Sequence, residues 1–209
     1  EKREMEGVVF HSNGEQAHML TCPWDPEVLL WANYKQKCLF TMNIDGSNLH
    51  RYFDGIEFKG SGHFSWDRAN KRITTCCDIK DKHCVGASFY IGSQDYAQYD
   101  SFIIDSQCHP NASVDGRYIV MDPERYPVGD YRNGLHLVDT ENNTFQSLAV
   151  LDTSKSFWED EETGETIKSE FLHPNPVFSP DGKYIVCHSD FKSGTPHIYF
   201  VEVAALTNL

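Results

Sequence analysis

Hydrophobic and polar positions follow one another along this chain in short units that recur four times. Each unit has a small turn centred on an aspartate, followed by a run of apolar residues. The units are CPWDPEVLLWAN from Cys22, FSWDRANKRITTCC from Phe64, ASVDGRYIVMD from Ala112 and FSPDGKYIVCHSD from Phe178. The turn aspartates Asp25, Asp67, Asp115 and Asp181 are 42, 48 and 66 residues apart. A period in the forties with several short strands per unit is typical of a β-propeller.

The residues between these turns also have the pattern of strands. YIVCH and HIYFVEV alternate with strand period, and KCLFTMN-IDGS-NLHRYF predicts a hairpin with an Asp-Gly turn. No long helix is predicted. We therefore expect an all-β chain, a single propeller domain or fragment over 1–209, with about four blades of four antiparallel strands. The blades are expected at 15–55, 60–104, 107–151 and 170–205, and an acidic hairpin is inserted at 155–168.

Four blades are few for a propeller with repeats of this type. An open arc of blades leaves long strand edges unpaired, which folded proteins avoid. We therefore expect the remainder of the propeller to come from the same chain or from another copy of it.

Composition and charge narrow the classes of partner. Of the 209 residues, 40% are hydrophobic and 13% aromatic, which is sufficient for a folded core. With 18 Lys and Arg against 31 Asp and Glu, the net charge is −13, which argues against a nucleic-acid partner. No apolar run is long enough to span a membrane, and EKREMEGVVF at the N-terminus lacks the apolar segment of a signal peptide. The seven cysteines include no CxxC pair, so we expect buried thiols in a cytoplasmic protein without a membrane partner.

One histidine stands in each segment that leads into the first strand of a blade. These histidines are His18, His63, His109 and His173, and they precede the turn aspartates by 7, 4, 6 and 8 residues. Because the repeats of a propeller surround one axis, equivalent positions converge near the central channel. We expect at least two of the four to share a function. The alternative is that each is a structural residue of its own blade.

Two of these histidines lie in similar polar segments. One segment is Gln107-Cys108-His109-Pro110-Asn111, and the other runs from Glu170 through His173-Pro174-Asn175. Imidazole, carboxylate and amide oxygen together suit a divalent cation such as Mn²⁺. The alternative is that the His-Pro-Asn sequence only shapes the entry into a strand.

Basic residues are predicted on the same face, in the loops between the second and third strands of the blades. They give an acidic protein a locally positive face for a small anionic ligand. The residues are Lys35, Lys37, Lys80, Lys82, Arg125, Arg132 and Lys192.

The ordered motifs resemble oligogalacturonate lyase. The segments that carry the resemblance are His18-Met-Leu-Thr-Cys-Pro-Trp-Asp-Pro26, Phe40-Thr-Met-Asn-Ile-Asp-Gly-Ser47, Gly62-His-Phe-Ser-Trp66, the His109 segment with Ser-Val-Asp-Gly-Arg117, and His173-Pro-Asn-Pro-Val-Phe-Ser-Pro-Asp-Gly-Lys183. The resemblance covers nearly all of the chain. It implies part of a seven-bladed propeller that cleaves short pectin-derived uronides by β-elimination and uses a Mn²⁺-type metal.

The resemblance also implies roles for individual residues. His63 matches the catalytic base, and His109 and His173 match two metal ligands. Asn175 stands where a third metal histidine is usual, and Glu170 where a metal-binding glutamine is usual. Cys38 replaces an arginine that assists the reacting uronate, and Lys37 beside it is the candidate cation. His18 and Arg132 are candidates for binding the sugar.

Two other functions remain open. A propeller with structural histidines can bind a protein or a glycan without catalysis. A related propeller enzyme can act on another anionic sugar, for which the changes at Cys38 and Asn175 are suited.

Overall fold

The computed structural model describes the chain in ten stretches. These are residues 16–33, 38–52, 58–79, 82–99, 109–122, 132–152, 157–159, 166–168, 174–189 and 197–205. Over these residues the protein is built from antiparallel sheets, and its one helix is the short 3-10 turn η1 (Val203–Ala205). No helix in these stretches is long and apolar enough to cross a membrane.

The first two sheets have four strands each, paired in chain order. The first contains β1 (Gln16–Cys22), β2 (Asp25–Asn33), β3 (Cys38–Asn43) and β4 (His50–Arg51). The second contains β5 (Phe58–Asp67), β6 (Arg72–Ile79), β7 (Lys82–Tyr90) and β8 (Tyr96–Tyr99). Each strand pairs antiparallel with the next one along the chain, so each sheet is a meander.

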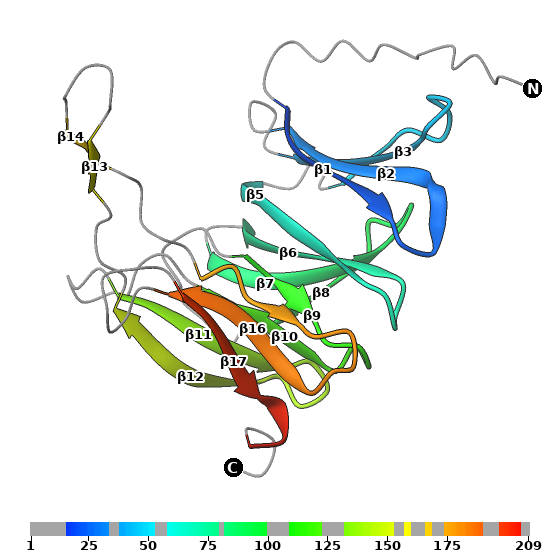
Figure 1. The fold of residues 1–209 in the computed structure, drawn as a ribbon. Coiled ribbons are helices and arrows are strands. Elements are labelled where there is room, and N and C mark those ends of the chain that lie inside the picture. Colours follow the sequence, from blue (N-terminus) through cyan, green and yellow to red (C-terminus); the bar gives the residue numbers. More distant parts are fainter. Residues whose placement is uncertain are drawn as a thin grey trace, which may run out of the picture.

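The third and fourth sheets are separated along the chain by a hairpin. The third contains β9 (Asn111–Ala112), β10 (Tyr118–Met121), β11 (Arg132–Asp139) and β12 (Thr144–Asp152). The hairpin pairs β13 (Phe157–Glu159) with β14 (Thr166–Lys168), and stands away from the sheets (Figure 1). The fourth sheet has three described strands, β15 (Val177–Phe178), β16 (Tyr184–Ser189) and β17 (His197–Glu202), rather than the four that the sequence predicts.

The sheets follow one another in space in the order of the chain (Figure 1). Their first strands lie innermost and contact one another in sequence: β1 contacts β5, β5 contacts β9, and β9 contacts β15. These first strands are therefore brought together, although the chain separates them by 40 residues or more.

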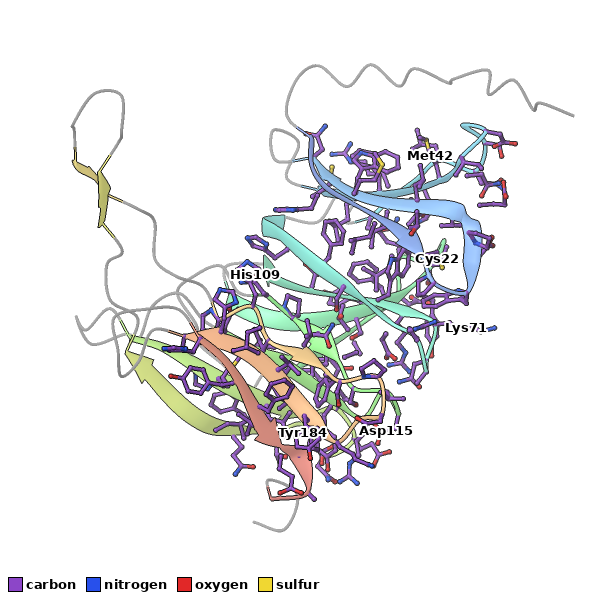
Figure 2. The ribbon with its side chains drawn as sticks, in the orientation of Figure 1. Cys22, Met42, Lys71, His109, Asp115 and Tyr184 are labelled. Carbon is purple, nitrogen blue, oxygen red and sulfur yellow. The ribbon has the colours of Figure 1, made fainter. Side chains whose placement is uncertain are left out.

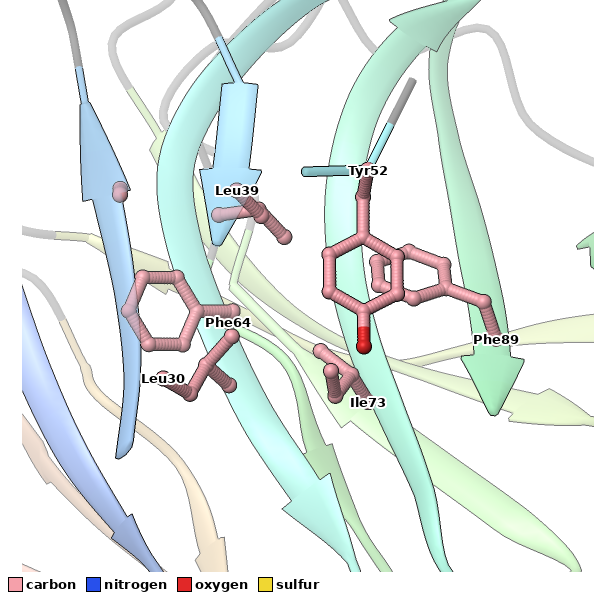
Figure 3. Close-up of a cluster of buried hydrophobic side chains, with 7 residues drawn as sticks. Leu30, Leu39, Tyr52, Phe64, Ile73 and Phe89 are labelled. Carbon is pink, nitrogen blue, oxygen red and sulfur yellow. The ribbon is translucent and has the colours of Figure 1, made fainter. Parts of the chain in front are cut away.

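Apolar clusters fill the space between neighbouring sheets. Figure 3 shows the cluster between the first two sheets, which joins Leu30, Leu39 and Tyr52 to Phe64, Ile73 and Phe89. Similar clusters join the second sheet to the third through Tyr99, and the third to the fourth through Ile185. Burial of these side chains provides the main favourable term for packing the sheets.

The last sheet has a face that other described residues do not cover. On β17, Ile198 is 69% exposed and Phe200 is 65% exposed, whereas corresponding apolar side chains between the earlier sheets are buried. The described strands therefore form an open series of sheets and not a closed ring.

Candidate functional site

Three of the four aligned histidines converge at one end of the innermost strands. The His18 and His63 ring centroids are 5.2 Å apart, and those of His63 and His109 are 4.2 Å apart. These residues come from β1, from β5 and from the position two residues before β9. The convergence of equivalent repeat positions, inferred from sequence, is thus observed for these three side chains.

Irregular strand pairing places two of these histidines. The register of β1 against β2 shifts between Ala17 and Met19, and His18 between them has a positive φ of 51°. The register of β5 against β6 shifts between Gly60 and Phe64, a segment that includes His63. A bulge re-aims a side chain out of the regular alternation of a strand. The backbone there is held in part by Thr75, whose hydroxyl donates to the His63 carbonyl at 2.7 Å.

A buried carboxylate holds the third histidine. The backbone N–H of His109 donates to Asp122 Oδ1 at 2.7 Å, and its ring Nδ1 lies 3.0 Å from Oδ1 and 3.1 Å from Oδ2. The Asp122 side chain is fully buried, and that of His109 is 22% exposed. Asp122 directly follows β10, so the third sheet supplies both the histidine and its partner.

The same carboxylate also holds the second His-Pro-Asn segment. The backbone N–H of Asn175 donates to Asp122 Oδ2 at 2.8 Å. A second bond between the segments runs from the Phe178 backbone N–H to Asn111 Oδ1 at 2.9 Å. Asn175 itself has a positive φ of 45° and an exposed side chain. The two similar segments are therefore joined across the third and fourth sheets.

The charge of Asp122 also acts on two buried ionisable side chains, His136 and Cys187. Burial lowers the pKa of His136 to about 4, against the opposing effect of the Asp122 charge. Burial, assisted by the same charge, raises the pKa of the Cys187 thiol to about 11. The His136 ring stacks on Phe145 at 4.8 Å. At neutral pH both groups are therefore uncharged.

Of the remaining predicted site residues, the structure describes some and not others. Asn175 lies at the histidine end through its bond to Asp122. Arg132 begins β11, and the pairing of Met121 with His136 puts the start of that strand at the same end of the third sheet. The predicted residues Lys37, Glu170 and His173 lie outside the described residues.

Cys38 is buried, and this limits its role. Its side chain is 3% exposed and packs in an apolar cluster with Trp31, Phe40 and Met42. A thiol in that position does not contact a solvent-borne ligand. Cys22 and Cys187 are also buried free thiols.

Asp122 is the residue that sequence reasoning missed. A signal was present, because Asp122 ends the run Tyr-Ile-Val-Met-Asp and a charge directly after a buried strand needs a partner. The sequence does not identify that partner, because the residues that contact Asp122 are 13 and 53 positions away along the chain.

A divalent cation fits the described residues in part. Metal-ligating histidines usually donate their second ring N–H to a carboxylate, a backbone carbonyl or water. The Nδ1 atom of His109 lies 3.0 Å from Asp122 Oδ1, which is a suitable partner of this kind. Asn175, whose backbone bonds to the same Asp122, has an exposed side chain with an amide oxygen that could serve as a further ligand. Within the ten described stretches there is no group of three or more His, Cys, Asp or Glu side chains that can hold a metal.

A separate cavity of about 430 Å³ lies between the first two sheets. It is lined by the turn that follows β3 and the turn that follows β7, together with Val28, Thr41 and Met42. His50 is its single ionisable lining residue. The cavity is at the turn end of the sheets, so it is not part of the histidine cluster.

Comparison with known proteins finds structural but no sequence relatives. No family model and no curated protein matches the chain. Among solved structures, an oligogalacturonate lyase in complex with manganese has a TM-score of 0.68 and 21% identity, and the match covers 91% of this chain and 49% of the lyase. The oligogalacturonate lyase of Vibrio parahaemolyticus has a TM-score of 0.67 and 19% identity, covering 90% and 49%. A putative TolB from Agrobacterium tumefaciens has a TM-score of 0.65 and 13% identity, covering 93% and 61%.

The chain has the fold of part of a β-propeller. It spans about half the length of the two lyases that it matches. At these identities the likeness establishes the fold, and the chemistry must be argued from the residues.

Proposed function

We propose that the chain is part of a propeller lyase that cleaves short uronide oligosaccharides of the oligogalacturonate type by metal-assisted β-elimination. The convergence of His18, His63 and His109, with His109 held by buried Asp122, is the observation that carries the proposal. The likeness to two lyases, one of them a manganese complex, supports it. The proposed substrate is a small anionic oligosaccharide, and the proposed compartment is the cytoplasm, where buried free thiols are usual.

The reaction requires a base that removes the proton alpha to the uronate carboxylate. A neutral imidazole is suited to this step near neutral pH, and we assign it to His63, whose ring lies between those of His18 and His109. As the proton moves to His63, the electron pair forms the new double bond and the glycosidic oxygen leaves. We assign His18 to contact with the sugar.

A divalent cation, when bound, would stabilise the negative charge that develops on the uronate carboxylate. His109, Glu170, His173 and Asn175 would hold it, with Mn²⁺ as the proposed ion. Lys37 and Arg132 would supply positive charge for the anionic substrate in a protein whose net charge is −13.

The test is a lyase assay on oligogalacturonates with Mn²⁺, following the ultraviolet absorbance of the unsaturated product. We expect activity in the wild-type chain and its loss in His63→Ala. The control is His197→Ala, because His197 is an exposed residue of β17 outside the cluster. Equal activity in His63→Ala and the wild type would contradict the assignment of the base.

The burial of Cys38 favours a second candidate. A buried thiol stands where the resemblance has an arginine beside the reacting uronate. A propeller with this change is suited either to another anionic sugar or to binding a protein or glycan without catalysis. Binding of Mn²⁺ and oligogalacturonate without product formation would favour the non-catalytic function.

A further inference from the structure

We infer that Asp122 is a positioning residue that fixes the ring tautomer of His109 and links His109 to the backbone of Asn175. The part of this inference that concerns metal affinity rests on the proposed function. The part that concerns the tautomer rests on the contacts of Asp122 alone.

The hydrogen-bond pattern assigns the proton on His109. Asp122 Oδ1 accepts the His109 backbone N–H and Oδ2 accepts the Asn175 backbone N–H, so the carboxylate acts as an acceptor toward both. The ring Nδ1 is 3.0 Å from Oδ1 and 3.1 Å from Oδ2, and it therefore donates its hydrogen to the same group. In a neutral imidazole one nitrogen carries hydrogen and the other has a free lone pair. Asp122 thus leaves Nε2 of His109 as the lone-pair nitrogen.

The buried position of Asp122 strengthens its effect on the tautomer of His109. Its side chain is fully buried, so water does not compete for the carboxylate. Its partners lie 13 and 53 residues away along the chain and belong to segments that enter β9 and β15. One side chain therefore sets both the orientation of His109 and the backbone position of Asn175.

The substitution Asp122→Asn changes the hydrogen-bonding groups that face His109 while leaving the packing nearly unchanged. Asparagine has nearly the same shape, and its oxygen can still accept a backbone N–H. Its amide nitrogen is a donor, however, and a donor facing Nδ1 favours the tautomer with hydrogen on Nε2. In a catalytic triad the same exchange preserves the geometry and yields the wrong tautomer.

The experiment is long-range ¹⁵N–¹H NMR of the histidine rings at mildly alkaline pH, on the full chain. We expect the Nδ1–H tautomer of His109 in the wild type and the Nε2–H tautomer in Asp122→Asn. The matched control is Asp139→Asn at the opposite end of the third sheet, where the carboxylate binds Arg117 and Asn142. The control is expected to keep the wild-type tautomer of His109.

The wild-type spectrum decides the matter if the variant does not fold. An Nε2–H tautomer of His109 in the wild type would overturn the inference without any variant. A retained preference for the Nδ1–H tautomer of His109 in folded Asp122→Ala, which has no acceptor at this position, would overturn it as well.

Calorimetric titration with Mn²⁺ extends the test to the proposed metal site. Loss of a carboxylate partner of a ligating histidine lowers metal affinity about 10- to 100-fold, and we expect that loss in Asp122→Asn but not in Asp139→Asn. If the wild type binds no Mn²⁺, the proposed function fails, while a switched tautomer still supports the role of Asp122. If Mn²⁺ binds equally well to a folded variant whose tautomer has switched, the positioning of a metal ligand is contradicted.

Discussion

The two ends of the sheets use aspartate in opposite ways. At the turn end, Asp115 and Asp181 are exposed, and each accepts a serine hydroxyl at 2.6 Å and a backbone N–H two residues further on. At the histidine end, Asp122 is buried and its partners lie 13 and 53 residues away. Figure 2 shows His109 at one end of the sheets and the turn residues Lys71 and Asp115 at the other. Asp115 and Asp181 shape single turns, whereas Asp122 joins two segments at the end where the histidines meet.

Removal of the Asp122 carboxylate is expected to have the largest effect. In Asp122→Ala the backbone N–H groups of His109 and Asn175 and the ring Nδ1 lose their buried partner. Partly buried donors left without a partner cost about 1 kcal/mol or more each, so we expect the free energy of unfolding to fall by about 3 kcal/mol. Denaturant unfolding followed by tryptophan fluorescence measures the change. If Asp122→Ala lowered the free energy of unfolding no more than Asp181→Ala does, the proposed difference between the buried and the exposed aspartates would be contradicted.

Gly116 tests a turn in which the glycine itself packs closely against a neighbouring turn. Its φ is +74°, and its carbonyl accepts a hydrogen bond from Asn70 Nδ2 at 3.1 Å. A Cβ there would overlap the Asn70 amide and lie 2.9 Å from Asp67 Oδ1. We expect Gly116→Ala to lower the free energy of unfolding by about 2–3 kcal/mol.

Gly92 is the matched control for that substitution. Its φ of +75° is nearly the same, and a Cβ there would meet nothing within 4 Å. Gly92→Ala should therefore cost only the backbone penalty of about 1 kcal/mol. Equal losses in the two variants would show that the contact with Asn70 has no effect on stability.

The Arg117–Asp139 pair is expected to give a smaller, pH-dependent effect. The Arg117 guanidinium donates to Asp139 Oδ2 at 2.8 Å, and this bond is the main reason that the pKa of Asp139 is lowered from 3.8 to about 2. Because the folded-state pKa lies below the unfolded value, the stabilisation is present above pH 3.8 and is lost as the pH falls through about 2.

Arg117→Gln removes that stabilisation. The difference in unfolding free energy between wild type and variant should therefore be seen at neutral pH and vanish at about pH 2. It should be smaller than the effect of Gly116→Ala, because water screens the partly exposed pair. Exposed Arg68 in a neighbouring turn supplies the control Arg68→Gln. A difference that does not depend on pH would contradict the assignment to Asp139.

Asp181→Ala is expected to have the smallest effect of the series. Its carboxylate is exposed, and its hydrogen bonds to Ser179 and Lys183 lower its pKa. Water replaces an exposed acceptor when the side chain is removed, so Ser179 and Lys183 remain solvated. Denaturant unfolding should show a change below those of the preceding variants, and the NMR signals of the histidine rings should not move.

The fold could be predicted from sequence because its signals are local. The Asp-Gly turns, the alternation in YIVCH and the spacing of the repeats each depend on residues close together in the chain. The repeat also places equivalent histidines near one axis, and His18, His63 and His109 meet accordingly.

The site could be predicted only in part because its decisive contacts are not local. Asp122 contacts Asn175 across two sheets, and no sequence period relates these positions. The shifts in register that place His18 and His63 also arise from pairing between strands. The buried position of Cys38, in a cluster with Trp31 and Phe40, likewise follows from packing within the first sheet.

The most direct test of the account is whether the histidine end binds a divalent cation. The measurement is calorimetric titration of Mn²⁺ into the wild-type chain, His109→Ala and the exposed control His197→Ala. The account predicts saturable binding in the wild type and in His197→Ala, and its loss in His109→Ala. Absence of binding in the wild type, or undiminished binding in His109→Ala, would contradict it.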